Sequence, residues 1–334
     1  MTLAAALRIL LFAVLTAMPT PAGPPARFAD ESAARRPSQS ADLAMTIDAP
    51  AEIRLATVCH GGHVVGAGKD PNVYVWSIPA GTLTGTIAAG ERVSTLACSP
   101  DGRWIAAGTQ SGLILLIDAR TRDVAHRLTV TQHLINTIVF SPDSSLLAAC
   151  PDDGPAQLWN VETGSRGAVL QTPAGASLSV AFSADADRIA TADEDTRVRL
   201  SERGGKLLRE LDAGLLASMD VAFSADGSQV LAAGVDRTIT VFDASSGNVA
   251  RRSAAEADLI GYLMRLPDGH SFAVLELDEF TLAPTMLKAW DIRSGQFRSL
   301  LSASDVIGAA IVSNGLVVVT ARGDKRRLEI RTVR

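Results

Sequence analysis

The sequence has no excess of basic residues. Its 31 Lys and Arg against 36 Asp and Glu leave a formal net charge of −5. The basic pairs Arg35-Arg36, Arg251-Arg252 and Arg326-Arg327 are far apart along the chain. A protein that binds a phosphate backbone needs clustered positive charge to attract it. We therefore expect no nucleic-acid partner.

Sequence signatures of catalysis are also missing. The chain has no Gly-x-Ser-x-Gly elbow, no His-Glu-x-x-His zinc motif and no glycine-rich phosphate loop. Its five histidines are too few to identify a metal ring or a nucleophilic triad. The sequence therefore predicts a protein that is not an enzyme and that carries no cofactor.

Cysteine is scarce, and the three present (Cys59, Cys98 and Cys150) cannot all pair. A chain of 334 residues with 47% hydrophobic residues can bury a large core without disulfides. We expect all three to be small buried hydrophobes. Cys59, His60 and His63 form the most ligand-like cluster, because thiolate and imidazole suit zinc or copper. No fourth ligand follows nearby, so these three are only a weak metal candidate.

The first 40 residues differ in character from the rest of the chain. Leu3 to Ala17 is almost wholly apolar, and prolines and small residues follow it. This order is typical of a signal peptide, and the apolar run is shorter than the ~20 residues that span a bilayer. We expect a signal peptide over residues 1–22, a flexible linker over 23–40, and a periplasmic or secreted protein without a membrane span after cleavage. An uncleaved leader that anchors the protein remains the alternative.

Internal repetition is the strongest feature after residue 40. A turn related to Ser-Pro-Asp-Gly recurs at steps of 42, 42, 41 and 42 residues, starting at Ser99, Ser141, Ser183, Ser224 and Leu266. An aromatic or aliphatic residue that ends an alternating segment recurs at Trp76, Ile117, Trp159, Leu200, Phe242, Trp290 and Ile330. A period near 42 residues predicts seven units of one repeat architecture.

Each unit reads as four short strands. Runs such as 104–107 and 239–242 are β-branched or aliphatic and are bounded by Gly, Asp and Ser. One four-stranded sheet cannot bury both faces, so the units must stack, and closing them into a ring protects the sheets. The last unit has only three strands, while a strand-like segment at 43–47 precedes the first. We predict an all-β, seven-bladed β-propeller over residues 41–334, closed by an N-terminal strand that completes the last blade.

This pattern resembles the WD40-repeat family, as a degenerate, bacterial-type exported member. The resemblance rests on Trp76-Ser77, Trp159-Asn160, Phe242-Asp243 and Trp290-Asp291, and on an acid six residues before the marker at Asp70, Asp153, Glu194, Asp236 and Asp324. It implies that this acid braces a tight turn. The family's Gly-His pair is absent, and His133 is the only histidine near its place. The resemblance therefore implies that the family's buried Asp-His-Ser-Trp network is incomplete in every blade.

Acidic loops and one long loop are the candidate binding features. Asp153, Glu194, Asp236 and Arg237 lie in equivalent loops of consecutive units, which a propeller places on one rim. These acids are either turn residues or a patch for Ca²⁺ or a cationic ligand. A 48-residue step before Trp290 adds about six residues around Asp278, Glu279 and Phe280, and loops that outgrow a scaffold often carry function. An aromatic residue in an acidic loop suits a protein contact, unless Phe280 folds back onto its own blade.

These observations predict a non-catalytic scaffold that binds a protein or peptide partner through rim loops. The candidate partner-binding residues are Asp278, Glu279, Phe280, Asp153, Glu194, Asp236 and Arg237. The alternative is an exported, lactonase-like hydrolase with metal or acid–base groups at the mouth of the central channel. Fold resemblance alone does not identify the partner.

Overall fold

A computed structural model describes residues 42–173, 175–212, 218–254, 259–278, 284–302, 306–312, 315–322 and 325–333. These residues form strands and turns, and none of them belongs to a helix. Across the described ranges, therefore, no helix is long and apolar enough to cross a lipid bilayer. The segments expected to be signal peptide and linker, 1–22 and 23–40, lie outside the described residues.

The strands form seven antiparallel sheets of four strands, numbered here as blades 1 to 7. Blades 1 to 3 contain β2 (Ile53–Cys59), β3 (His63–Gly68), β4 (Asn72–Ser77), β5 (Leu83–Ala88); β6 (Val93–Cys98), β7 (Trp104–Thr109), β8 (Leu113–Asp118), β9 (Val124–Thr129); and β10 (Ile135–Phe140), β11 (Leu146–Pro151), β12 (Gln157–Asn160), β13 (Arg166–Val169). Blades 4 and 5 contain β14 (Ser177–Phe182), β15 (Arg188–Asp193), β16 (Arg197–Glu202), β17 (Leu207–Asp212); and β18 (Ser218–Phe223), β19 (Gln229–Gly234), β20 (Thr238–Asp243), β21 (Val249–Ala254). Blades 6 and 7 contain β22 (Leu259–Arg265), β23 (Ser271–Leu277), β24 (Pro284–Asp291), β25 (Phe297–Ser302); and β26 (Val306–Val312), β27 (Gly315–Arg322), β28 (Arg327–Val333), β1 (Asp42–Asp48).

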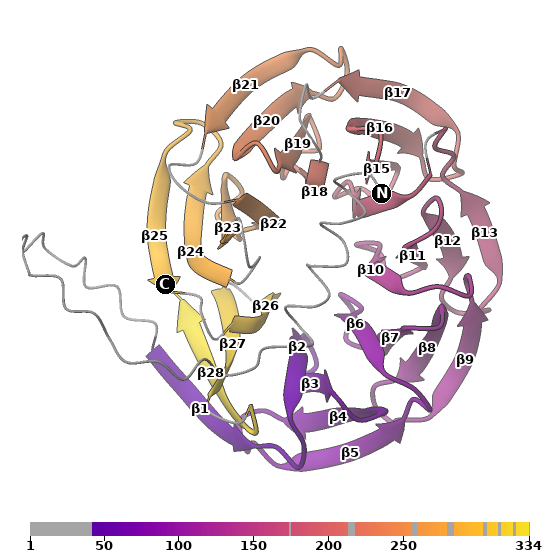
Figure 1. The fold of residues 1–334 in the computed structure, drawn as a ribbon, viewed down its shortest axis with the longest axis vertical. Coiled ribbons are helices and arrows are strands. Elements are labelled where there is room, and N and C mark those ends of the chain that lie inside the picture. The colour runs from indigo at the N-terminus through magenta and orange to yellow at the C-terminus, as the bar shows by residue number, and fades with distance from the viewer. Residues whose placement is uncertain are drawn as a thin grey trace, which may run out of the picture.

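The seven sheets stand around a common axis, with the first strand of each blade innermost (Figure 1). The N-terminal strand β1 pairs with β28, with Ile47 opposite Leu328, and so completes the seventh sheet. This confirms the predicted seven-bladed β-propeller and its closure by an N-terminal strand. Because β1 belongs to blade 7 and is followed directly by β2 of blade 1, the pairing of β1 with β28 joins the last blade to the first.

Burial follows the position of a strand within its blade. The second strand β7 is buried at all six residues, and the third strand β8 is buried at its four central residues. Neighbouring blades cover both faces of these strands, so their sequences are continuous apolar runs. The outermost strand β17 is mostly exposed. The core therefore lies between blades. Where the ring closes, Trp76 packs with Val319 and Ile330 of the last blade.

The repeated Ser-x-Asp turn is held by its own side chains. The Ser99 hydroxyl bonds the Asp101 carboxylate, which also accepts the Arg103 amide hydrogen at 3.0 Å. The same hydroxyl accepts the Trp104 amide hydrogen at 2.9 Å, and Gly102 adopts the left-handed φ of 73° that the turn requires. The serine recurs in blades 2 to 5 with the same bond to its aspartate. In blade 6 Leu266 takes its place, and the Asp268 carboxylate alone bonds the turn backbone.

Candidate partner-binding face

The two ends of the propeller carry different connections. Because strands alternate in direction, the links from second to third strand and from blade to blade lie on one face, which we call face A. The turns from first to second and from third to fourth strand lie on the opposite face, face B. Asp153, Glu194, Asp236 and Arg237 all lie in face A links, in blades 3, 4 and 5.

The long loop also belongs to face A. It connects β23 to β24 in blade 6 and spans residues 278–283, whereas the equivalent link in blade 5 spans 235–237. Asp278 is partly buried at the start of this loop. Glu279 and Phe280 lie outside the described residues. The candidate positions therefore occupy equivalent links in four consecutive blades.

In blade 3, Asp153 ties two links of face A together. Its carboxylate accepts a hydrogen bond from the Thr131 hydroxyl at 2.8 Å, and the His133 imidazole lies 3.6 Å from it. Thr131 and His133 belong to the link between blades 2 and 3. The indole N–H of Trp159 in the same blade is buried without a hydrogen-bond partner, as are those of Trp76 and Trp290. In these three blades the buried network expected from the resemblance is incomplete, as predicted.

The acids of blades 4 and 5 also bond nearby backbone. Glu194 accepts the Ala176 amide hydrogen at 3.1 Å. Asp236 accepts the Thr238 amide hydrogen at 3.2 Å and its hydroxyl hydrogen at 2.8 Å. Arg237 occupies the left-handed region with φ of 66°. The Asp236 contacts fit the turn-bracing role that the resemblance implies, whereas Glu194 bonds the link that precedes its blade. Both acids are partly buried.

Blade 4 contains a buried ion network that the sequence reading missed. The Arg199 side chain is 2% exposed and lies 2.7 Å from Asp193, 2.5 Å from Asp195 and 3.0 Å from Glu210. Burial raises the pKa of Asp193, whereas bonding to Arg199 lowers the pKa of Asp195. The carboxylates of Asp193 and Asp195, on either side of Glu194, are thus held by a guanidinium. The sequence signal for this was Arg199 itself, two residues after Arg197 on an alternating strand.

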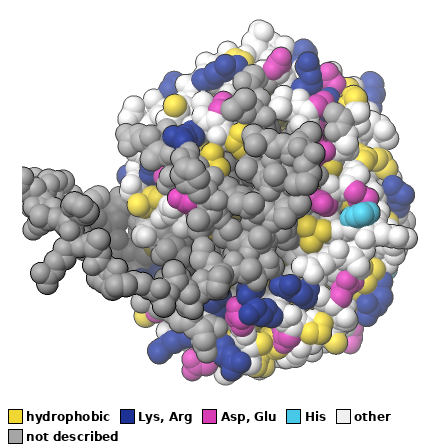
Figure 2. Space-filling model, viewed as in Figure 1, with side chains coloured by type: hydrophobic (Ala, Val, Ile, Leu, Met, Phe, Trp, Pro, Cys, Tyr) yellow, Lys and Arg dark blue, Asp and Glu magenta, His cyan; other side chains and the backbone are white. Residues whose placement is uncertain are grey.

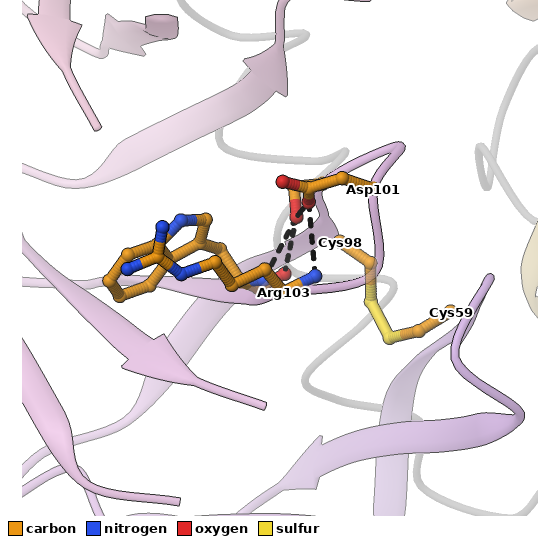
Figure 3. Close-up of a disulfide and its surroundings, with 6 residues drawn as sticks. Cys59, Cys98, Asp101 and Arg103 are labelled. Atoms are coloured by element: carbon orange, nitrogen blue, oxygen red, sulfur yellow. Dashed lines mark hydrogen bonds between the residues drawn. A yellow bond between two sulfur atoms is a disulfide. The ribbon is translucent and has the colours of Figure 1, made fainter. Parts of the chain in front are cut away.

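The weak metal candidate is wrong, and so is part of the expectation for cysteine. Cys59 forms a disulfide with Cys98, with their Cα atoms 5.4 Å apart (Figure 3). The bond joins the ends of β2 and β6, the innermost strands of blades 1 and 2. The Cys59 sulfur is therefore not available as a thiolate ligand beside His60 and His63. Cys150 is buried and lies outside the disulfide, as expected. Within the described ranges, no group of three His, Cys, Asp or Glu side chains is placed to hold a metal ion.

Charges of both signs are mixed over the face shown in Figure 2. Lys and Arg side chains alternate with Asp and Glu around the visible, described rim. Charged side chains also pair between turns of face B, as in the contact of Arg103 with Glu162 at 2.9 Å. This distribution agrees with the small net charge and offers a polar rim of the kind found in protein interfaces.

Comparison with known families matches two parts of the ring. The profile of the anaphase-promoting complex subunit 4 WD40 domain matches residues 72–141, and that of the WD domain, G-beta repeat, matches residues 205–243. The first match runs from β4 to the turn after β10, and the second from the turn before β17 to β20. Both matches therefore cross blade boundaries.

Similar proteins carry the same repeats. The chain is 28% identical over 141 residues to WD repeat-containing protein SL1-17 of Schistosoma mansoni, covering 42% of this chain and 46% of that protein. It is 28% identical over 146 residues to telomerase protein component 1 of Rattus norvegicus, covering 44% and 5% respectively. It is 30% identical over 112 residues to echinoderm microtubule-associated protein-like 2 of Rattus norvegicus, covering 34% and 17%. The chain thus spans less than half the length of each of these relatives.

Proposed function

Because the chain belongs to the WD40-repeat family, we propose that it is an exported, non-catalytic scaffold that binds a protein or peptide partner through the loops of face A. The observation that carries the proposal is the placement of the candidate residues. Equivalent links of blades 3 to 6 share one face, and the longest of these four, at 278–283, lies among them. A rigid ring that presents adaptable loops is a common basis for binding.

The names of the similar proteins favour an interaction role. One matching profile describes a subunit of a complex, and one relative is named as a component of telomerase. WD40 propellers are typically interaction scaffolds, and the partial coverage leaves the identity of this chain's partner to experiment. The hydrolase alternative gains no support from the described residues, which hold no cluster of potential metal ligands.

One feature supports export. The Cys59–Cys98 disulfide suits an oxidising compartment such as the periplasm or the cell exterior. Mass measurement of the mature N-terminus tests this part: cleavage after Ala22 supports export by a signal peptide, and retention of Met1 refutes cleavage.

Affinity capture from the native cell envelope tests the binding function. We expect a stoichiometric partner that is lost with Phe280→Ala and weakened with Asp278→Ala. Leu207→Ala provides the matched control, because Leu207 is an exposed apolar residue on the outer strand β17, away from face A. Failure to capture a partner, or equal loss in the control, would refute the proposed face. Thermal unfolding of each variant separates loss of binding from loss of fold.

A further inference from the structure

One level of the ring is formed by equivalent residues of the innermost strands. In blades 1 to 6 each first strand has a register shift near its start, and the residue after the shift occupies the same position. These six residues are Leu55, Thr95, Thr137, Ser179, Asp220 and Tyr262. Among the six, Asp220 is the only carboxylate and Tyr262 the only aromatic residue, and they lie in neighbouring blades.

The Asp220 carboxylate in blade 5 bonds residues of the blades on both sides, at the inner wall of the ring. The Ser179 hydroxyl of blade 4 donates to its Oδ1, and the Leu263 amide of blade 6 donates to its Oδ2 at 2.7 Å. Leu263 lies on β22, whose only sheet partner is β23 on its outer side. The amide that reaches Asp220 therefore points away from the sheet, toward the propeller axis. The carboxylate lies at the axial surface of the ring.

Tyr262 stands beside this carboxylate and is accessible. Its side chain is 49% exposed although it belongs to an innermost strand, so the exposed part faces the axis. The protein groups that surround the partly exposed ring, together with the charge of Asp220, raise the pKa of Tyr262 to about 12, so it remains a neutral phenol. Both β18 and β22 begin on face A, and the pair therefore lies toward the face A end of the axis.

The charge of Asp220 is not balanced within the described residues. Its donors are the Ser179 hydroxyl and the Val221 and Leu263 amides, and none of these carries a formal charge. Across the described ranges, no Lys, Arg or His lies within ion-pair distance of it. Burial raises the pKa of Asp220 to about 6, so the group is mainly ionised at neutral pH. Asp220 is partly buried, and a carboxylate withdrawn from water without a cation is costly unless a ligand supplies one.

We propose that Asp220 and Tyr262 form an axial subsite for an alkylammonium group. The carboxylate supplies the opposite charge, and the exposed aromatic ring supplies a cation–π surface. An ammonium suits this carboxylate better than a guanidinium does. Both carboxylate oxygens already accept protein hydrogens, whereas bidentate guanidinium binding needs both oxygens free in one plane. The inference rests on the proposed function, since it names the chemical group that a bound partner presents at face A.

Titration with butylammonium followed by NMR tests the subsite directly, with butanol as the uncharged control. We expect saturable binding of butylammonium and none of butanol at the same concentration. Asp220→Asn should weaken binding about tenfold or more, and Tyr262→Leu about threefold to thirtyfold, while Tyr262→Phe stays within about twofold. Thr137→Ala, at the same level in blade 3, should leave binding unchanged. Equal binding to Asp220→Asn and the parent protein would overturn the subsite.

Further measurements distinguish the sources of the ammonium group. Asp220→Asn keeps an oxygen that accepts the Leu263 amide hydrogen, so this variant should fold. If it does not fold, butylammonium binding to Tyr262→Leu tests the subsite.

If the ammonium group belongs to a peptide partner, a blocked tripeptide with a central lysine should bind and its acetyl-lysine form should not. Butylammonium affinity should fall below pH 6 as Asp220 takes up a proton, Tyr262 being its titratable neighbour.

Two results separate the axial subsite from the scaffold role. Butylammonium binding that depends on Asp220, without any captured partner, would remove the scaffold role and retain a site for small amines. A partner captured equally by Asp220→Asn and by the parent protein would overturn the axial subsite and retain the scaffold role.

Discussion

Removing the Cys59–Cys98 disulfide should cost the protein much of its stability. The two residues are separated by 39 positions in the sequence and close a loop that includes most of blade 1. The loss of loop-closure entropy in the unfolded chain for about 40 residues corresponds to about 4 kcal/mol at 25 °C. This is a large part of the ~5–15 kcal/mol that separates folded from unfolded states in ordinary domains.

Urea unfolding of a double-mutant cycle measures this contribution. Cys59→Ala and Cys98→Ala each break the link, so the double variant should be little worse than either single variant. The coupling between the two substitutions should then be about 4 kcal/mol. Cys150→Ala is the control, because Cys150 is buried but forms no disulfide. It should lose the contacts of one sulfur atom and show no coupling to Cys59.

A thiol count provides an independent check. The unreduced protein, unfolded in denaturant, should react with one equivalent of a thiol reagent, at Cys150. After reduction it should react with three. Three reactive thiols before reduction, or a coupling below about 1 kcal/mol, would refute the structural role of the disulfide and weaken the argument for an oxidising compartment.

Three further substitutions test the physical account of the blades. Thr196→Gly should stabilise the protein by about 1 kcal/mol in urea unfolding, because Thr196 holds a left-handed φ of 69°. The control Thr86→Gly, on the outer strand β5, should destabilise the protein by a similar amount. Arg199→Met should cost about 3–5 kcal/mol by leaving buried carboxylates unpaired, whereas Arg197→Met, at an exposed position, should change stability by less than about 1 kcal/mol. Because burial raises the pKa of Asp220 from 3.8 to about 6, the folded state binds its proton more tightly. The protonated Asp220 side chain therefore adds about 3 kcal/mol to the free energy of unfolding below pH 3.8. This contribution is lost as the pH rises through 6. Unfolding curves from pH 4 to pH 7 should show this difference between parent and Asp220→Asn, and parallel curves would contradict it.

Much of the architecture was predictable because its signals are local. The Ser-x-Asp turn bonds its own backbone within five residues, so its recurrence at Ser99, Ser141 and Ser183 reports one turn per blade. The same register predicted that the loops with Asp153, Glu194 and Asp236 share one rim. The disulfide was missed although Cys59 and Cys98 end the first strands of adjacent units. Because the repeat register makes these two strand ends neighbours, it could have predicted the disulfide.

The side-chain clusters were harder to predict because they unite several strands. Arg199 is buried only because Asp193, Asp195 and Glu210 surround it from the second strand, the following link and the outer strand. Alternation along β16 places Arg199 on the same side as Arg197, yet Arg197 is much more exposed. The difference arises from depth within the blade, which no local pattern records.

The sequence by itself determined the number of blades, the strand that closes the ring and the common rim of the equivalent acidic loops. These follow from period-two strands and short turns, whose energetics act over a few residues. Only the tertiary structure decided which residues of different blades meet: the disulfide, the Arg199 network, and Asp220 beside Tyr262 at the axis. The reason is that ring closure brings together residues about 40 positions apart, through packing between sheets and not through contacts within any one repeat.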